Sequence, residues 1–135
     1  MGALVVDAQP LIAILLREGS AAEATSRLRE QRMRGDILLC AVTLAEVLYV
    51  VRRRLGPHAA SRVAALLDDV PIAVVDVNRP LATHAADLKA RHNLGLGDAF
   101  AAALALATGS PLLTGDADFR ALKEHGLTLE WVGGD

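Results

Sequence analysis

The sequence contains little cysteine and few aromatic residues. Its one cysteine, Cys40, excludes an internal disulfide framework and is typical of a protein kept in a reducing compartment. Aromatic residues make up 3% of the chain, whereas hydrophobic residues make up 53%, so the predicted core is aliphatic and rich in alanine. At 135 residues, the chain is expected to form a single domain over residues 1–135 with a full hydrophobic core.

Long hydrophobic runs and a strong excess of one charge are also missing. No apolar run approaches the roughly 18 residues that cross a bilayer. Asp7 and Pro10 interrupt the apolar N-terminal stretch and no basic segment precedes it, so no signal peptide is expected. The net charge of −2 excludes a general polycation but leaves room for a local basic patch that binds nucleic acid. We therefore expect a cytoplasmic protein that does not associate with membranes.

Several common motifs of enzymes are absent. The sequence has no GxxxxGK[ST] phosphate loop, no GxGxxG dinucleotide loop and no serine in a nucleophile elbow. Gln9 stands where an aspartyl-phosphate phosphatase would need a second acid after Asp7. The histidines have no metal-ligand spacing and are expected at the surface or at helix ends; they are His58, His84, His92 and His125.

Short apolar runs alternate with longer periodic or charged segments along the chain. The apolar runs predict strands at about residues 3–6, 37–41, 72–77, 112–113 and 127–132. The segments between them predict helices at about residues 10–16, 21–34, 44–55, 58–69, 79–92, 99–107 and 119–124. The polar helix 21–34 is expected to expose its charges, Arg27 included, and to bury Ala24, Leu28 and Met33. This alternation predicts an α/β fold with a parallel sheet covered on both faces.

Two apolar runs end in acidic residues. The stretch LLTGDADF, residues 112–119, breaks at Gly115 and delivers Asp116 and Asp118, and the run ALVVD ends in Asp7. If the two strands are parallel neighbours, Asp7 and Asp116 meet at their carboxyl ends, where open α/β sheets place their sites. The alternative is that residues 112–119 form an ordinary solvated turn, since Asp and Gly are common turn residues.

Two further acids lie in apolar surroundings at predicted helix starts. Glu46 has the capping-box spacing from Thr43, and Asp98 stands where it could cap the alanine-rich helix, so capping alone explains each of them. A doubly wound fold would instead bring both acids to the same sheet edge as Asp7 and Asp116. Such a cluster repels itself unless a cation is present, and oxygen-only ligands select Mg²⁺ or Mn²⁺. The chemistry that uses this arrangement is metal-assisted phosphodiester hydrolysis.

Three blocks of sequence resemble the PIN-domain ribonucleases, most of all the VapC-type toxins of bacterial toxin–antitoxin pairs. They are VVDAQPLIAILL, AVTLAEVLYVVRR and LGLGDAFAAALALATGSPLLTGDADFRAL. The resemblance implies a PIN-like fold with a central parallel sheet of about five strands flanked by helices. It also implies a Mg²⁺- or Mn²⁺-dependent endoribonuclease that hydrolyses RNA phosphodiester bonds.

The resemblance also implies roles for individual residues. The catalytic residues would be Asp7, Glu46, Asp98 and Asp116. Asp7 and Asp98 would be the main metal ligands, and Asp116 would join them or, with Glu46, orient or deprotonate water. Thr114 would hydrogen-bond a site carboxylate or a substrate phosphate, and Asp118 matches a less consistent acid of the family. One departure is the segment after Asp7, where the family often has Ser or Thr and this chain has Ala8, Gln9 and Pro10.

The expected partners are an RNA substrate, a cognate antitoxin protein and a second copy of the chain in a homodimer. Arg53 lies seven residues after Glu46, on the same helix face, and is expected to hold the RNA backbone; the alternative is a solvated helix end favoured by the helix dipole. The antitoxin is expected on helix 21–34 and the helices near residues 44–69. Two other functions stay open: a PIN nuclease of RNA processing or DNA-flap cleavage, and a catalytically silent binding module, against which the four acids argue.

Overall fold

Short apolar runs form the strands of one parallel sheet. The computed structural model describes residues 2–133, and in that range the sheet has five strands in the order β3-β2-β1-β4-β5. The strands are β1 (Leu4–Val6), β2 (Ile37–Cys40), β3 (Ala73–Val75), β4 (Leu112–Thr114) and β5 (Leu129–Trp131). Every pairing is parallel, and Val5 in the central strand lies opposite Leu38 on one side and Leu112 on the other. The predicted α/β class and parallel sheet are confirmed.

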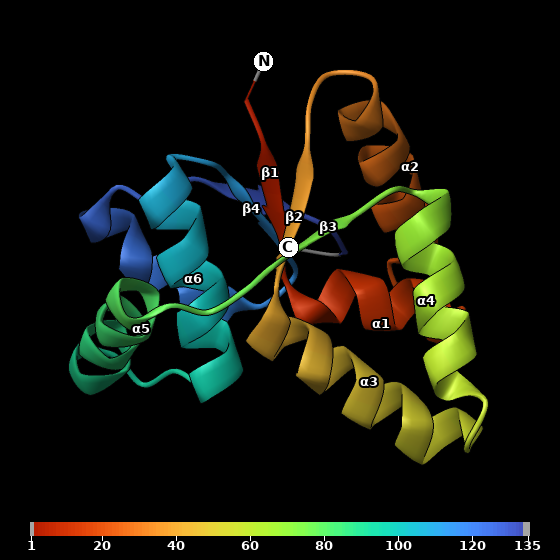
Figure 1. Ribbon diagram of the computed structural model, residues 1–135. Helices are drawn as coiled ribbons and strands as arrows, with labels where there is room; N and C mark the ends of the chain where they lie inside the picture. Colours follow the sequence, from red (N-terminus) through yellow and green to blue (C-terminus); the bar gives the residue numbers. More distant parts are fainter. Residues whose placement is uncertain (1, 134–135) are drawn as a thin grey trace.

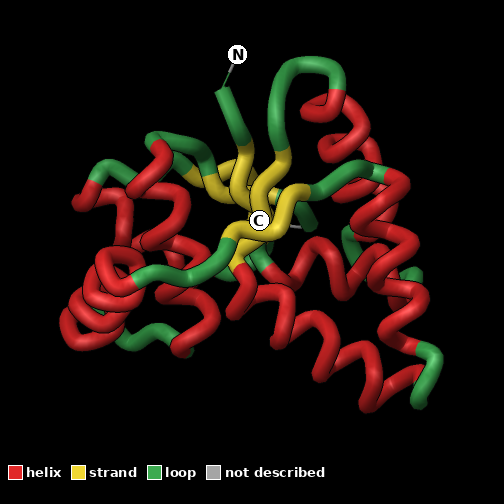
Figure 2. The backbone as a smooth tube through the Cα atoms, in the orientation of Figure 1, coloured by secondary structure: helices red, strands yellow, loops and turns green. Residues whose placement is uncertain are grey.

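Helices cover both faces of this sheet. They are α1 (Ala8–Leu16), α2 (Ala21–Arg32), α3 (Ala41–Leu55), α4 (Ala59–Asp69), α5 (Arg79–Arg91), α6 (Leu96–Thr108) and the 3₁₀ helix η1 (Ala117–His125). Helices α1 to α4 gather on one side of the strands, and α5 and α6 lie on the other (Figures 1 and 2). None of the helices within residues 2–133 is long and apolar enough to cross a membrane.

The strands divide the core into two clusters because successive side chains point to opposite faces. Val5 packs with α5, α6 and η1, whereas Leu4 and Val6 pack with α1 to α4. Helix α6 is apolar nearly all round, and each of its residues from 99 to 105 is buried. The predicted burial of this alanine-rich helix is confirmed, and its small side chains let it lie close to the sheet.

Two helices begin earlier than predicted. Helix α3 starts at Ala41, directly after β2, so Thr43 lies inside the helix and is fully buried instead of capping it. Helix α6 starts at Leu96, so Asp98 is its third residue and is not an N-cap. Both cap assignments were therefore wrong, because an apolar run such as ILLCAV contains no residue that marks where the strand stops and the helix begins.

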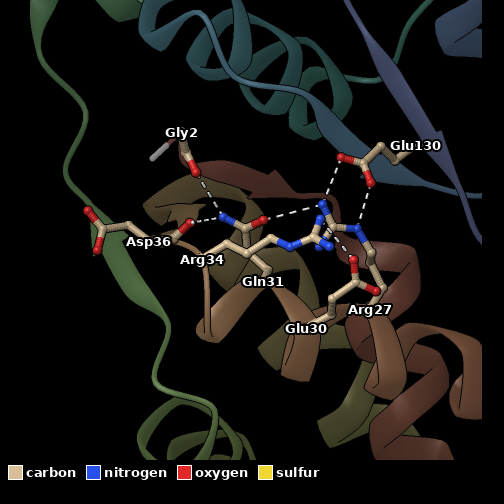
Figure 3. A network of polar contacts seen from close by, with 7 residues as sticks. All are labelled: Gly2, Arg27, Glu30, Gln31, Arg34, Asp36 and Glu130. Atoms are coloured by element: carbon tan, nitrogen blue, oxygen red, sulfur yellow. Dashed lines mark hydrogen bonds and ion pairs between the residues drawn. The ribbon is translucent and has the colours of Figure 1, made fainter.

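Polar residues of helix α2 bind it to the sheet through hydrogen bonds (Figure 3). Arg27, predicted to be exposed, is largely buried and binds both carboxylate oxygens of Glu130 on β5, at 2.6 and 2.9 Å. The buried amide of Gln31 donates to the two backbone carbonyl groups that precede β1 and β2. Met33, predicted to be buried, is 85% exposed. Hydrogen bonding, and not only the apolar stripe of Ala24 and Leu28, decides which residues of α2 face the sheet.

Candidate active site

The central strands bring the first and last acids of the site together. Asp7 follows β1 directly, and its backbone N–H donates to the carbonyl of Leu113 on β4, at 3.0 Å. Asp116 follows β4 after one residue, Gly115, and stands at the N-terminus of η1. Since β1 and β4 are parallel neighbours, both acids lie at the same edge of the sheet, as their positions after apolar runs predicted.

The other two acids come from helices on either side of the sheet. Glu46 lies on α3, beyond its first turn, and Asp98 lies in the first turn of α6. A side chain added at Gly97 would collide with the carboxylate of Glu46. The Glu46 carboxylate is therefore packed against the first turn of α6, in space that the glycine leaves free.

All four predicted acids line one pocket of about 480 Å³. The lining residues are Asp7, Gln9, Ile12, Glu46, Asp98, Gly115, Asp116 and Ala117. Gly115 is required at the pocket wall, because a Cβ there would lie 2.7 Å from the Val132 carbonyl oxygen and 2.6 Å from the amide oxygen of Gln9. Asp118 is exposed and does not line the pocket; its backbone N–H donates to Asp116 Oδ1 at 2.9 Å.

The side-chain hydroxyl of Thr114 forms hydrogen bonds with two of the acidic residues. Its hydroxyl donates to Asp7 Oδ2 at 2.8 Å and accepts from the backbone N–H of Asp116 at 3.0 Å. The residue is fully buried. Of the two roles expected for Thr114, the structure contains the hydrogen bond to a site carboxylate, and its burial keeps the hydroxyl away from the pocket surface where a phosphate would lie.

The pocket disfavours negative charge. Burial, followed by the charge of Asp98, raises the pKa of the Asp7 carboxyl from 3.8 to about 7, and the hydrogen bond from Thr114 only partly offsets this. Burial and the charges of Glu46, Asp116 and Asp118 raise the pKa of Asp98 to about 6. The pKa of Glu46 is raised by burial and by Asp116. Near neutral pH, the metal-free pocket therefore retains protons that a cation would displace.

The donor set fits a hard divalent cation. Asp7 Oδ1 is buried and has no hydrogen-bond partner among the residues that the structure describes, although buried carboxylate oxygens are normally paired. In the same part of the chain, no three of the pocket acids bring one oxygen each within 4.8 Å of one another. Mg²⁺ does not require three converging carboxylates, because it binds through one or two and keeps several waters.

Arg53, predicted to contact RNA, is exposed on α3 and does not line the acidic pocket. Its guanidinium donates to the hydroxyl of Tyr49 at 3.1 Å and lies 5.7 Å from the centre of that ring. Its predicted role in substrate binding stays a prediction.

Gln9 lines the pocket, although it was not among the predicted site residues. Gln9 is exposed in the first turn of α1, two residues after Asp7, and its amide reaches the pocket wall at Gly115. Its place two residues after the first acid was the signal that the sequence offered.

Two of the histidines lie at helix ends, as predicted, but they also meet in space, which the sequence did not indicate. His92 follows α5 and His125 ends η1, and their Nε2 atoms lie 2.8 Å apart. A separation of 33 residues hid this pair, because only the packing of η1 beside α6 brings the two segments together.

Solved structures of toxin–antitoxin proteins share this fold at low sequence identity. VapBC2 from Rickettsia felis, bound to a DNA fragment from its promoter, matches with a TM-score of 0.80 and 16% identity over 96% of this chain and 98% of that chain. VapC20 from Mycobacterium tuberculosis, a toxin that cleaves the sarcin–ricin loop, matches with a TM-score of 0.72 and 23% identity over 87% and 93%. DNA-bound VapBC from Salmonella typhimurium matches with a TM-score of 0.70 and 18% identity over 97% and 98%.

Among curated proteins, no sequence matches this chain significantly. The family model of the PIN domain, however, matches residues 4–125, which include every strand from β1 to β4 and all four pocket acids. The chain belongs to the PIN domain family.

Proposed function

We propose that this chain, as one PIN domain over residues 1–135, is a Mg²⁺- or Mn²⁺-dependent endoribonuclease and the toxin half of a type II toxin–antitoxin pair. The observation that carries the proposal is the acidic pocket, in which four carboxylates meet and the buried Asp7 Oδ1 has no partner within the described part of the chain. The raised pKa values of Asp7, Glu46 and Asp98 show that their negative charges are costly in a fold that does not use them. A divalent cation removes that cost.

Each residue of the pocket has a separate role in the proposed hydrolysis. Asp7 and Asp98 would hold the cation, and Asp116 would bind it directly or through water. When bound, the metal would supply Lewis acidity at the scissile phosphate and lower the pKa of its water. Glu46 orients the attacking water and accepts its proton, and in-line attack leaves a 3′-hydroxyl and a 5′-phosphate. Thr114 keeps Asp7 in position through its 2.8 Å hydrogen bond.

Two residues outside the acid set are placed to contact the RNA. The amide of Gln9 lies at the pocket wall and supplies a neutral donor for a phosphate oxygen. Arg53 supplies a positive charge for the backbone further along the strand, from the same helix as Glu46. An RNA substrate is supported by the similarity to VapC20, a toxin that cleaves the sarcin–ricin loop.

The antitoxin is proposed to bind the groove between α1, α2 and α4. This groove has a volume of about 620 Å³ and combines apolar walls with three arginines. Its lining residues are Ile14, Arg17, Thr25, Leu28, Arg29, Arg32, Leu66, Asp69 and Val70. Apolar side chains flanked by acids would complement it, and several structural neighbours are toxin–antitoxin assemblies.

The decisive test is to incubate the purified protein with total RNA and Mn²⁺ and to map the cut sites. The wild type is expected to cut at defined positions and to stop when EDTA is added, whereas Asp98→Asn is expected to leave the RNA intact. Asp118→Asn is the matched control, because Asp118 lies outside the pocket lining and its loss is expected to leave most of the activity. Cleavage of DNA flaps but not of RNA would indicate the other nuclease function. No cleavage of either substrate would indicate a binding module.

A further inference from the structure

A second cluster of potential ligands lies outside the acidic pocket. His92 caps the C-terminal end of α5, and Glu124 and His125 are the last two residues of η1. None of the three lines the acidic pocket. We propose that His92, Glu124 and His125 form a second, separate metal site, which binds a borderline divalent cation of the Zn²⁺ class.

The three side chains converge through one atom each. The Nε2 atoms of His92 and His125 are 2.8 Å apart, and Glu124 Oε1 lies 3.7 Å from the first and 3.5 Å from the second. Two ligands bonded to one tetrahedral zinc ion at 2.0–2.1 Å lie about 3.3–3.4 Å from each other. The two carboxylate distances are already close to this value, and the histidines need to separate by only about half an ångström.

A hydrogen bond between the histidines explains only part of this arrangement. It accounts for the 2.8 Å distance if one Nε2 donates and the other accepts, but it leaves no reason for one carboxylate oxygen to face both nitrogens. The imidazoles are largely enclosed, with 13% and 25% of their side chains exposed, whereas Glu124 is 67% exposed. The cluster therefore has a buried nitrogen side and an open carboxylate side through which an ion and a water ligand can enter.

The donor atoms distinguish this cluster from the acidic pocket. Two imidazole nitrogens and one carboxylate are a ligand set of zinc, and they favour Zn²⁺, Co²⁺, Ni²⁺ or Cu²⁺ over Mg²⁺ and Mn²⁺. The pocket's oxygen-only donors instead suit hard ions such as Mg²⁺ and Mn²⁺. One chain would thus hold two cation sites that differ in their donor atoms.

An ion bound at this cluster would also affect the stability of the fold, because the cluster joins two separate segments. The loop after His92 leads into the first turn of α6, which contains Asp98, and η1 begins directly after Asp116. An ion bound to His92 and His125 would join the loop before α6 to the far end of η1. It would stabilise the native fold, because the ligands are brought together only when the chain is folded.

The test uses the full chain after removal of any affinity tag and after treatment with a chelator. At a free Zn²⁺ concentration of 100 times Kd, the folded-to-unfolded ratio is expected to rise about a hundredfold, seen as a higher melting temperature. His92→Gln and His125→Gln are expected to lose this Zn²⁺-dependent shift. His58→Gln, a change of an exposed histidine elsewhere, is expected to keep it. Asp7→Asn is also expected to keep it, which separates this site from the acidic pocket.

A second readout covers the case in which a histidine variant fails to fold. Glu124 is exposed, so Glu124→Gln should fold normally and weaken Zn²⁺ binding by roughly tenfold or more. Co²⁺ added to the wild type should give the visible absorption of a tetrahedral ion, and Glu124→Gln should change it. The proposal is overturned if Zn²⁺ stabilises folded His92→Gln or His125→Gln as much as the wild type, if only Asp7→Asn loses the shift, or if Glu124→Gln leaves both Zn²⁺ affinity and the Co²⁺ spectrum unchanged.

Discussion

Asp7 combines near-complete burial with a charge that the fold disfavours. It is 2% exposed, and only one of its carboxylate oxygens is hydrogen-bonded by the described residues. Such a residue lowers the stability of the protein unless a ligand compensates for it. The buried charge of Asp7 therefore lowers the stability of the protein and also provides the proposed metal ligand. Substitution of Asp7 can separate these two effects.

Asp7→Asn and Asp98→Asn are each expected to lower RNA cleavage by about a thousandfold or more, since each removes a proposed metal ligand. The melting temperature without metal should hold or rise, because one charge leaves a repelling cluster. Cleavage of labelled RNA and thermal melting, with Asp118→Asn as the control, measure the two effects. A variant that unfolds would show that the acid is structural, and full activity in a folded variant would show that it has no part in the reaction.

Gly97→Ala tests whether the position of Glu46 matters. The added methyl group displaces the Glu46 carboxylate, which is the end of a flexible side chain, so folding should be unaffected or slightly improved within α6. Activity is expected to fall by about tenfold to a hundredfold, because the proton acceptor is displaced. Gly95→Ala is the matched control, since its Cβ would lie 3.6 Å from Asp98 Oδ2, an ordinary contact. Equal activity in the two variants would contradict a role for Glu46.

The metal-free protein is expected to lose stability as the pH rises from 5 to 8. The pKa of Asp7 in the folded state, about 7, lies above its value of 3.8 in the unfolded chain, so the folded state binds more protons in between. The free energy of unfolding falls between these two pKa values and levels off above about pH 7, and the melting temperature should drop by roughly 5 °C or more. Asp7→Asn should reduce this drop, and Mn²⁺ should reverse it. A melting temperature independent of pH and of Mn²⁺ would contradict the charge repulsion in the pocket.

At the scale of the elements, the attachment of α2 to the sheet depends on polar contacts. Arg27 holds β5 through two short hydrogen bonds to Glu130, and both side chains are largely enclosed. The exposed ion pair between Glu30 on α2 and Arg34, just beyond the end of that helix, connects no other element. The two pairs differ in burial and in what they join.

Arg27→Ala is therefore expected to lower the free energy of unfolding by about 1–3 kcal/mol, because it leaves Glu130 unpaired in a partly buried position. Arg34→Ala should change it by less than about 0.5 kcal/mol, as is usual for an exposed pair one helical turn apart. Urea unfolding of the two variants measures the difference. A similar loss in both would show that burial does not distinguish the pairs.

Some features of the helices and strands could be predicted from the sequence, and others could not. Apolar runs and their spacing were enough to predict the parallel sheet, the buried alanine-rich helix and the acids after β1 and β4, because these are properties of local patterns. The start of α3, the burial of Arg27 and the pairing of His92 with His125 could not be predicted. Each of them depends on which segments lie beside each other in the folded chain, and helix or strand periodicity does not contain that information.

At the scale of the whole molecule, helices carry more of the exposed large apolar side chains than the edge of the sheet does, among the residues that the structure describes. Tyr49 is 60% exposed on α3, and Leu96 is 54% exposed at the start of α6. At the edge of the sheet, Val74 on β3 is 40% exposed. Helices therefore offer more apolar surface for a second copy than this edge strand does.

We expect a homodimer at micromolar concentration that forms through helices and not through a sheet edge. Tyr49→Asp should weaken it, because a charge would be buried in the interface, whereas Val74→Asp should not. Sedimentation analysis of the wild type and of both variants measures this. A wild-type monomer would exclude the dimer, and a monomer produced only by Val74→Asp would place the contact at the edge of the sheet.

The pairing of β1 with β4 also determines when the acidic pocket can form during synthesis of the chain. β1 leaves the ribosome first, but its partner β4 and the Thr114 hydroxyl that holds Asp7 follow 107 residues later. Asp98 and Asp116 emerge after most of the chain, so a nascent chain carries Asp7 and Glu46 without the other half of their pocket. Contacts this distant in sequence form late in folding. As the proposed nuclease, the chain would remain inactive until translation of its own message has nearly ended, so the messenger RNA would not be cleaved while it is being translated.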